Sequence, residues 1–220
     1  MNIFYLSNDP VEAAQAHLDK HVVKMILEYA QLLCTAHRII DGTERVVLSD
    51  SGRKKKVWQL EDERDQLLYS ATHVNHPSAI WARSNSCSYE WLYKLFCATC
   101  DEYTYRYGKT HVTDTKLRDV LKKHPSRIGK AHMWIGPTPA MPDECKVPGD
   151  PLASYKKYYI DKKADMAKWT NREPPSWFIE GIKSKDAYVH LSLQQLRSTF
   201  RKDPKNVGSK TSRRARMSRV

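Results

Sequence analysis

The chain has 220 residues, of which 40% are hydrophobic, and a formal net charge of +12. This length suits one domain with a sizeable core. No apolar run approaches roughly 18 residues, and no charged region followed by an apolar stretch opens the chain, so we expect neither a membrane span nor a secretory signal. The five cysteines lack the spacing of a small disulfide-rich protein, which favours reduced thiols and a cytoplasmic location.

The positive charge is concentrated near the C-terminus. From residue 197 onward there are nine basic residues and one acidic residue, a net +8 of the total +12. We expect a helical domain over residues 1–200 and a basic tail over 201–220. Such a tail is suited to phosphate contacts, with Arg201 and Lys202 as candidate DNA-binding residues, and a disordered solubilising tail is the alternative.

The predicted fold class is mainly α: a compact single helical domain with a small β-hairpin excursion and the basic tail. In chain order, the pattern predicts a helix over 10–38, a hairpin over 45–60 that turns near Gly52, a helix over 61–73, an aromatic-rich helix over 78–107, a helix from about 113 to just before 125, an irregular proline-rich segment over 137–151, a helix over 151–169 and a last helix over 185–200.

Polar residues form a narrow line along the first predicted helix. At about 100° per residue, His17, His21, Lys24 and Glu28 fall on one side of a helix that is otherwise mostly apolar. One interpretation is an exposed strip with an ordinary Lys24–Glu28 pair. The interpretation we favour is a polar cleft, in which burial and neighbouring charges shift proton affinities, as in an enzyme.

Two shorter motifs have weaker chemical content. Cys97 and Cys100 are spaced as in a metal site, but they lie in an aromatic-rich helical pattern, which favours two core thiols one turn apart. A zinc site would need further ligands, such as Cys87 or a histidine, so we expect no metal. No phosphate-binding glycine loop or dinucleotide fingerprint is present, and we expect no cofactor.

The sequence Asn75-His76-Pro77 marks a helix start, because the residue before proline avoids helical backbone angles. With Arg83 shortly after it, this segment is compact enough to form a site, where the arginine would meet a phosphate. A turn that merely caps a helix is the alternative interpretation.

Several of these segments resemble a known family. The segment 19–33, Asp-Lys-His-Val-Val-Lys-Met-Ile-Leu-Glu-Tyr-Ala-Gln-Leu-Leu, resembles the N-K-R-L-G-K-Q-R-V-E-A-x-Q-I-L segment of bacterial proteins of the pyrimidine dimer DNA glycosylase family. Asn75-His-Pro77, Trp81 and Arg106-Tyr-Gly108 resemble further motifs of that family, and Arg201-Lys-Asp-Pro204 is similar to its C-terminal part. The resemblance covers roughly residues 1–110, with a weaker match at 174–204. The chain also resembles small proteins encoded by large bacteriophages.

The resemblance implies a DNA-repair enzyme that acts as a monomer on damaged double-stranded DNA. Such an enzyme cuts the glycosidic bond at a pyrimidine dimer and then cleaves the strand at the abasic site. Its nucleophile is the N-terminal α-amine, a group whose ordinary pKa near 8 leaves part of it neutral at pH 7. A nearby carboxylate stabilises the sugar cation or moves protons.

Mapped onto this sequence, the resemblance implies Met1, Glu28, Lys24 and His21 as catalytic residues. Where the family exposes a small threonine after removal of its methionine, this chain has the bulky Asn2, so we expect Met1 to be retained. Lys20 or Lys24 would otherwise replace the amine. The implied DNA-binding residues are His17, Lys20, Asn75, His76, Arg83, Arg201 and Lys202.

Two other functions stay open. An enzyme that modifies a nucleotide or a base would use the same polar line and would need a closed pocket there. A non-catalytic nucleic-acid-binding protein would need basic residues on one face. The DNA-repair enzyme that the resemblance implies requires instead an N-terminal amine beside Glu28.

Overall fold

The computed structural model describes residues 1–131 and 134–201, with side chains described up to residue 188. It divides into a compact unit, Met1–Ile179, and a second unit that begins at Glu180. In chain order the elements are α1 (Pro10–Ala16), α2 (Asp19–Asp41), β1 (Thr43–Leu48), β2 (Lys54–Gln59), α3 (Arg64–Leu67), α4 (Pro77–Ala82), α5 (Ser86–Tyr107), α6 (Val112–Leu121), a 3-10 turn (Asp143–Cys145), α7 (Pro151–Lys162), a second 3-10 turn (Ala164–Met166) and α8 (Ser176–Arg201). The mainly α class is confirmed.

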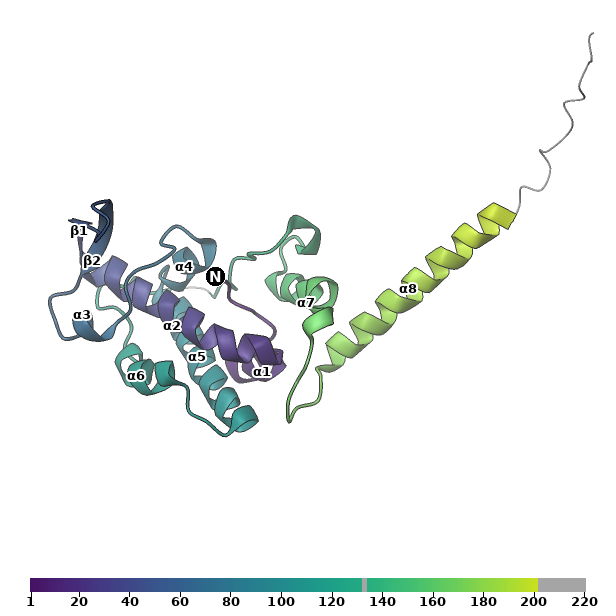
Figure 1. Ribbon diagram of the computed structural model, residues 1–220, viewed down its shortest axis with the longest axis horizontal. Helices are drawn as coiled ribbons and strands as arrows, with labels where there is room; N and C mark the ends of the chain where they lie inside the picture. Colours follow the sequence, from purple (N-terminus) through teal and green to yellow (C-terminus); the bar gives the residue numbers. More distant parts are fainter. Residues whose placement is uncertain (132–133, 202–220) are drawn as a thin grey trace, which may run out of the picture. The chain divides into compact units, whose positions relative to one another are not determined.

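Helices α2 and α5 form the centre of the compact unit (Figure 1). Helix α1 packs on α5, whereas α4 and α6 pack on α2. The core between them is apolar and aromatic, and its fully buried members include Ile26, Tyr29, Tyr89 and Phe96. Helix α5 is bounded by local signals, because Asn85 accepts a hydrogen bond from the Ser88 N–H at its start and Gly108 adopts the left-handed conformation at its end.

The predicted hairpin is confirmed. Strands β1 and β2 pair antiparallel, with Leu48 opposite Lys54 beside the turn and Thr43 opposite Gln59 at the base. Gly52 has a φ of 74° in the turn, which glycine adopts without steric cost. The base is fixed to the helical core because Arg38 of α2 donates a hydrogen bond of 2.9 Å to the Trp58 carbonyl.

The single helix predicted over 10–38 is wrong. His17 has an extended backbone conformation, with a ψ of 133°, and it separates α1 from α2. The Asp19 N–H donates to the Lys168 carbonyl at 2.8 Å, instead of continuing the helix. The break therefore depends on a partner about 150 residues away in the chain, which helical periodicity does not reveal.

The helix predicted over 61–73 is also wrong, because only Arg64–Leu67 is helical. The reason is the Arg38 guanidinium, which donates to the carbonyl oxygens of Asp65, Leu68 and Tyr69 at 2.7–2.9 Å. The carbonyls of Leu68 and Tyr69, which lie beyond this short helix, are thus held by a side chain of α2 instead of by helical hydrogen bonds.

Other predicted boundaries need smaller corrections. The aromatic-rich helix over 78–107 is two helices, α4 and α5, because Asn85 caps α5 after a turn. The helix over 151–169 ends at Lys162, and the last helix begins at Ser176, nine residues before its predicted start. Helix α6 and the irregular segment over 137–151, apart from one 3-10 turn, match the prediction. The predicted tail 201–220 lies outside the described residues from 202 onward.

A buried ionic network holds α1, α2, α5 and the segment before α8 together. The Arg106 side chain is fully buried, and it contacts Asp19 at 2.9 Å and Glu102 at 2.7 Å. Arg172 binds the second oxygen of Glu102 at 2.8 Å, and the Thr170 hydroxyl donates to Asp19 at 2.7 Å. Each buried charge therefore has an ionic or hydrogen-bonding partner.

Arg106→Met is expected to lower the free energy of unfolding by about 3–5 kcal/mol, because it leaves two carboxylates without their buried cation. Urea denaturation measures this change. Lys146→Met is the control, since Lys146 and its partner Asp143 are both exposed and such a surface pair contributes little to stability. Equal losses in the two variants would contradict the role of the network.

Candidate active site

The structure brings Met1, Lys24 and Glu28 together. The Glu28 carboxylate lies in the middle of α2, and its Oε2 atom is 3.9 Å from the α-amino nitrogen of Met1. The Asn2 N–H donates to the same oxygen at 3.2 Å. Lys24, one turn earlier on α2, places its Nζ 3.0 Å from Oε1. The Glu28 carboxylate thus interacts with the Met1 amine, the Asn2 backbone amide and the Lys24 ammonium group.

The N-terminal segment reaches Glu28 along a fixed path. Residues 3–6 are buried, so this short apolar segment lies in the core beside α2 (Figure 1). The Asn2 side chain donates to the Ala140 carbonyl at 2.8 Å and accepts from the Tyr155 hydroxyl at 2.7 Å. The proline-rich segment and α7 therefore anchor the residue next to the amine.

The exposed part of Met1 is its main chain. The Met1 side chain is only 3% exposed, while the residue as a whole is half-buried. Its exposure therefore belongs to the main chain, which carries the amine. Glu28 is 13% exposed and Lys24 is 68% exposed, so the three groups range from the protein interior to solvent.

The Met1 amine and Glu28 affect the ionisation of His76. It caps α4, where its Nδ1 accepts a hydrogen bond from the Ser78 N–H at 3.2 Å. Burial lowers the pKa of His76, and the positive charge of the Met1 amine lowers it further, while Glu28 opposes both effects. The helix-cap interpretation of Asn75-His76-Pro77 is therefore confirmed, while the interpretation as a phosphate site stays a prediction.

His17 and His21 lie elsewhere. His17 is fully buried at the α1–α2 break, where its ring nitrogens bond the Ala13 carbonyl and the Tyr29 hydroxyl. This placement corrects the expectation that His17 contacts DNA. His21 is also buried, its Nδ1 bonds the Tyr159 hydroxyl at 2.6 Å, and Phe4 stacks on its ring at 4.0 Å. His21 is therefore packed into the core, and its catalytic role stays a prediction.

The remaining predicted DNA-binding residues are dispersed. Lys20 and Asn75 are exposed. Arg83 is half-buried, its Nη1 is buried without a hydrogen-bond partner in the described part of the chain, and burial lowers the pKa of the guanidinium. The side chain of Arg201 and all of Lys202 lie outside the described residues. The predicted line of polar residues thus contains both exposed and buried side chains.

Asn2 and Tyr155 are site residues that the sequence interpretation missed. Tyr155 is fully buried and lies in the predicted helix after the proline-rich segment, but no local signal directs its hydroxyl to Asn2. Only the tyrosine-rich face of α7 suggests that this helix packs into the core.

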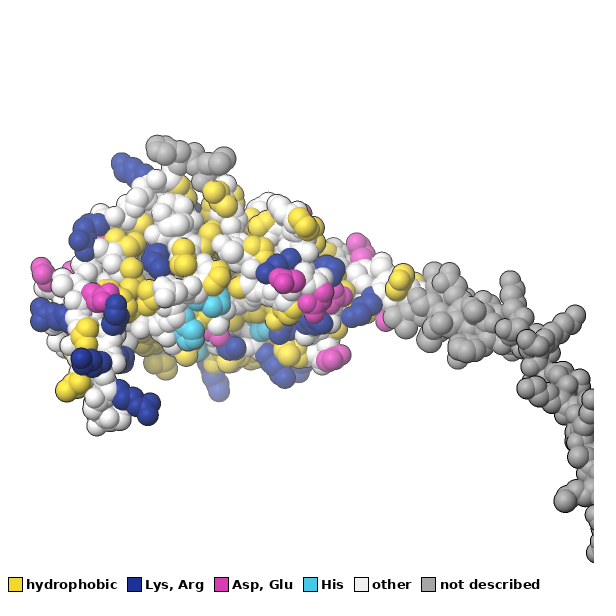
Figure 2. Space-filling model, turned by 90° about the horizontal axis from the view of Figure 1, so that it is seen from above, with side chains coloured by type: hydrophobic (Ala, Val, Ile, Leu, Met, Phe, Trp, Pro, Cys, Tyr) yellow, Lys and Arg dark blue, Asp and Glu magenta, His cyan; other side chains and the backbone are white. Residues whose placement is uncertain are grey.

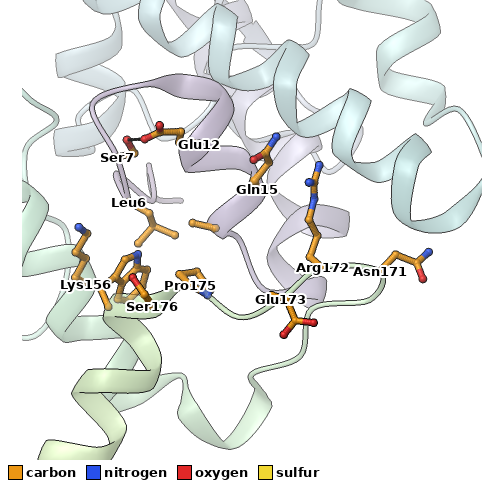
Figure 3. A pocket seen from close by; sticks show the side chains of 12 residues that line it. Leu6, Ser7, Glu12, Gln15, Lys156, Asn171, Arg172, Glu173, Pro175 and Ser176 are labelled. Carbon is orange, nitrogen blue, oxygen red and sulfur yellow. Dashed lines mark hydrogen bonds between the residues drawn. The ribbon is translucent and has the colours of Figure 1, made fainter.

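A cavity of about 560 Å3 lies away from this cluster. Its lining includes Ser7, Glu12, Lys156, Arg172 and Trp177, and none of the predicted site residues (Figure 3). The Ser7 hydroxyl donates to Glu12 at 2.7 Å, Arg172 is bound to Glu102, and Lys156 lies 5.5 Å from the centre of the Trp177 ring. The polar groups of this cavity are largely satisfied by their neighbours.

The cysteines do not form a metal site in the described part of the chain. Cys34, Cys100 and Cys145 are buried free thiols, and burial raises the pKa of Cys34 to about 12. Within the same residues, no group of three or more His, Cys, Asp or Glu side chains is arranged to hold a metal ion. No helix found there has the length and apolar character that a membrane span requires.

Comparison with known proteins gives no relatives. The chain matches no protein-family model, no curated protein and no solved structure. Interpretation of the site therefore rests on its own geometry.

Buried histidines make stability depend on pH. Burial lowers the pKa of His17 and of His37 to about 4, so in acid the unfolded chain binds protons that the folded chain does not. Stability is expected to fall as the pH drops from about 6.5 towards 4, with a slope near 1.4 kcal/mol per pH unit for each such histidine.

His17→Gln is expected to reduce the slope of the free energy of unfolding against pH by the contribution of one proton. Urea denaturation between pH 7.5 and 4.5 measures this slope. His73→Gln is the control, because His73 is exposed. An unchanged slope in His17→Gln would show that His17 is protonated equally in both states.

Proposed function

We propose that this protein is a DNA glycosylase with abasic-site lyase activity that uses the Met1 α-amino group as its nucleophile. The observation that carries the proposal is the position of this amine, 3.9 Å from the Glu28 carboxylate. An amine placed beside a carboxylate is the arrangement that imine chemistry on a sugar requires.

The amine nitrogen, in its neutral form, attacks C1′ of the deoxyribose. The C1′–N bond to the base breaks, and the base leaves with that electron pair and takes up a proton. Opening of the sugar ring then gives a protonated Schiff base between Met1 and C1′. Loss of a C2′ proton expels the 3′ phosphate by β-elimination, and water releases the amine.

Glu28 is suited to two parts of this sequence. Its negative charge stabilises the cation that develops at C1′, and its Oε2, which lies next to the amine, accepts and returns protons. Lys24 holds the other oxygen of Glu28 and is largely exposed, so its ammonium group is available to a DNA phosphate.

The net charge supports a polyanionic substrate. A total of +12 attracts DNA over long range and contributes a salt-dependent part of the affinity. The alternative of a nucleotide-modifying enzyme would need a closed pocket around the polar line, whereas the 560 Å3 cavity is lined by other residues. Double-stranded DNA containing a pyrimidine dimer is the substrate that we propose.

Glu28→Gln tests this proposal. Glutamine still accepts the hydrogen bond from Asn2 but cannot take up protons or stabilise a cation, so strand cleavage on ultraviolet-irradiated duplex DNA is expected to fall about 100-fold or more. Binding to the same duplex is expected to stay within about twofold, measured by fluorescence anisotropy.

Glu90→Gln, an exposed change on α5, is the matched control and should keep full activity. Full cleavage activity in Glu28→Gln, with the melting temperature unchanged, would remove Glu28 from the chemistry.

A further inference from the structure

The hairpin of β1 and β2 is exposed on both of its faces. Every residue of β1 is exposed, including Val46 at 60%, Val47 at 40% and Leu48 at 70%. In β2, only Val57 and Trp58 are half-buried. Isolated two-stranded hairpins are marginally stable in water, and exposed aliphatic side chains of this size are typical of interaction surfaces.

The same hairpin is strongly basic. Five basic residues lie on it or in its turn, against the acidic Glu44 and Asp50: Arg45, Arg53, Lys54, Lys55 and Lys56. Lys56 pairs with Glu44 at 2.7 Å. In the described part of the chain, no carboxylate is paired with any of the other four, so their charges are available to an anionic partner.

The strand register places basic and aliphatic side chains together. Directly opposite residues of an antiparallel pair share one face, so Val47 lies beside Lys55, and Leu48 lies beside Lys54 on the other face. Figure 2 shows hydrophobic and basic side chains interleaved on the protrusion at the left end of the compact unit, where Figure 1 places the hairpin. Both faces therefore combine positive charge with apolar contact area.

These features point to a duplex nucleic acid as the partner. We infer that the hairpin lies in the major groove of duplex DNA, with its basic side chains on the phosphates of both strands and Val46 and Leu48, which share one face, against the base edges. A strand of six residues spans roughly 20 Å, and a groove about 12 Å wide admits a two-stranded ribbon. The choice of DNA over another polyanion rests on the proposed function.

The hairpin is firmly attached to the unit that carries the amine. Besides the Arg38–Trp58 hydrogen bond, Gly42 at the end of α2 packs closely on the base of β2, since a Cβ there would lie 3.1 Å from the Gln59 carbonyl oxygen. The Leu60 N–H donates to Asp65 at 2.9 Å just after β2. Groove binding by the hairpin therefore orients α2, and with it Glu28, on the duplex.

The triple variant Arg53→Gln, Lys54→Gln and Lys55→Gln tests the phosphate contacts on undamaged duplex DNA, where no glycosylase chemistry is needed. If all three residues contact phosphates, the slope of log K against log salt is expected to fall by about 2.7, at roughly 0.9 per contact. The triple variant Lys109→Gln, Lys122→Gln and Lys123→Gln removes the same charge from exposed positions around α6 and is the control. Equal slopes in the two variants overturn the inference.

Dimethyl sulfate protection tests the groove itself, because this reagent methylates guanine N7 in the major groove. The wild-type protein is expected to protect guanines, and Leu48→Ser is expected to weaken that protection and raise the Kd severalfold with little change in the salt slope. Absence of guanine protection, equal affinity for duplex RNA, or self-association of the hairpin without DNA would each overturn the inference.

The outcomes separate this inference from the proposed function. Loss of salt slope in the hairpin variant without strand cleavage by the wild-type protein would keep the groove contact and reject the lyase chemistry. Strand cleavage by the wild-type protein, together with an unaltered salt slope in the hairpin variant, would keep the lyase chemistry and reject the groove contact.

Discussion

The buried Arg106 guanidinium is the interaction on which the compact unit depends. It joins α5 to Asp19 at the start of α2, and it donates a further hydrogen bond of 3.0 Å to the Gln15 carbonyl at the end of α1. The ends of α1 and α2 are thereby held at the break where His17 turns inward. Burying the Arg106 cation without its carboxylate partners would cost free energy, which disfavours other arrangements of α1 and α2 at this junction. The Arg106 contacts therefore fix the orientation of α2 relative to α1, and α2 carries Glu28.

The N-terminal segment makes the second half of the site. It is buried over residues 3–6, and the hydroxyl of Tyr29 lies 3.4 Å from the Phe4 nitrogen while also bonding His17. Asn2 ties the segment to the proline-rich loop and α7. The amine is thus delivered to Glu28 by the core itself, which removes most of the conformational freedom that a chain terminus would otherwise have. The hairpin, attached at the far end of α2, adds a basic surface to the same compact unit.

Local signals in the sequence were sufficient for part of this architecture. Helical spacing identified Lys24 and Glu28 as neighbours on α2, and the turn at Gly52 identified the hairpin. The spacing failed at His17, because the chain breaks there in response to contacts with Arg106 and Lys168 that no local pattern encodes. For the same reason the line of polar residues could not distinguish buried histidines from exposed lysines. The path that brings Met1 to Glu28 also depends on partners from distant segments, so only the family resemblance indicated the amine.

Borohydride trapping tests the central claim most directly. The wild-type protein is incubated with a duplex containing an abasic site and with ultraviolet-irradiated duplex, and any imine is reduced to a stable amine whose peptide is located by mass spectrometry. We predict a covalent adduct on the α-amino group of Met1 with both substrates. An adduct on Lys20 or Lys24 instead would contradict the assignment of the nucleophile. Absence of any adduct, with duplex binding retained, would contradict imine chemistry at this site altogether.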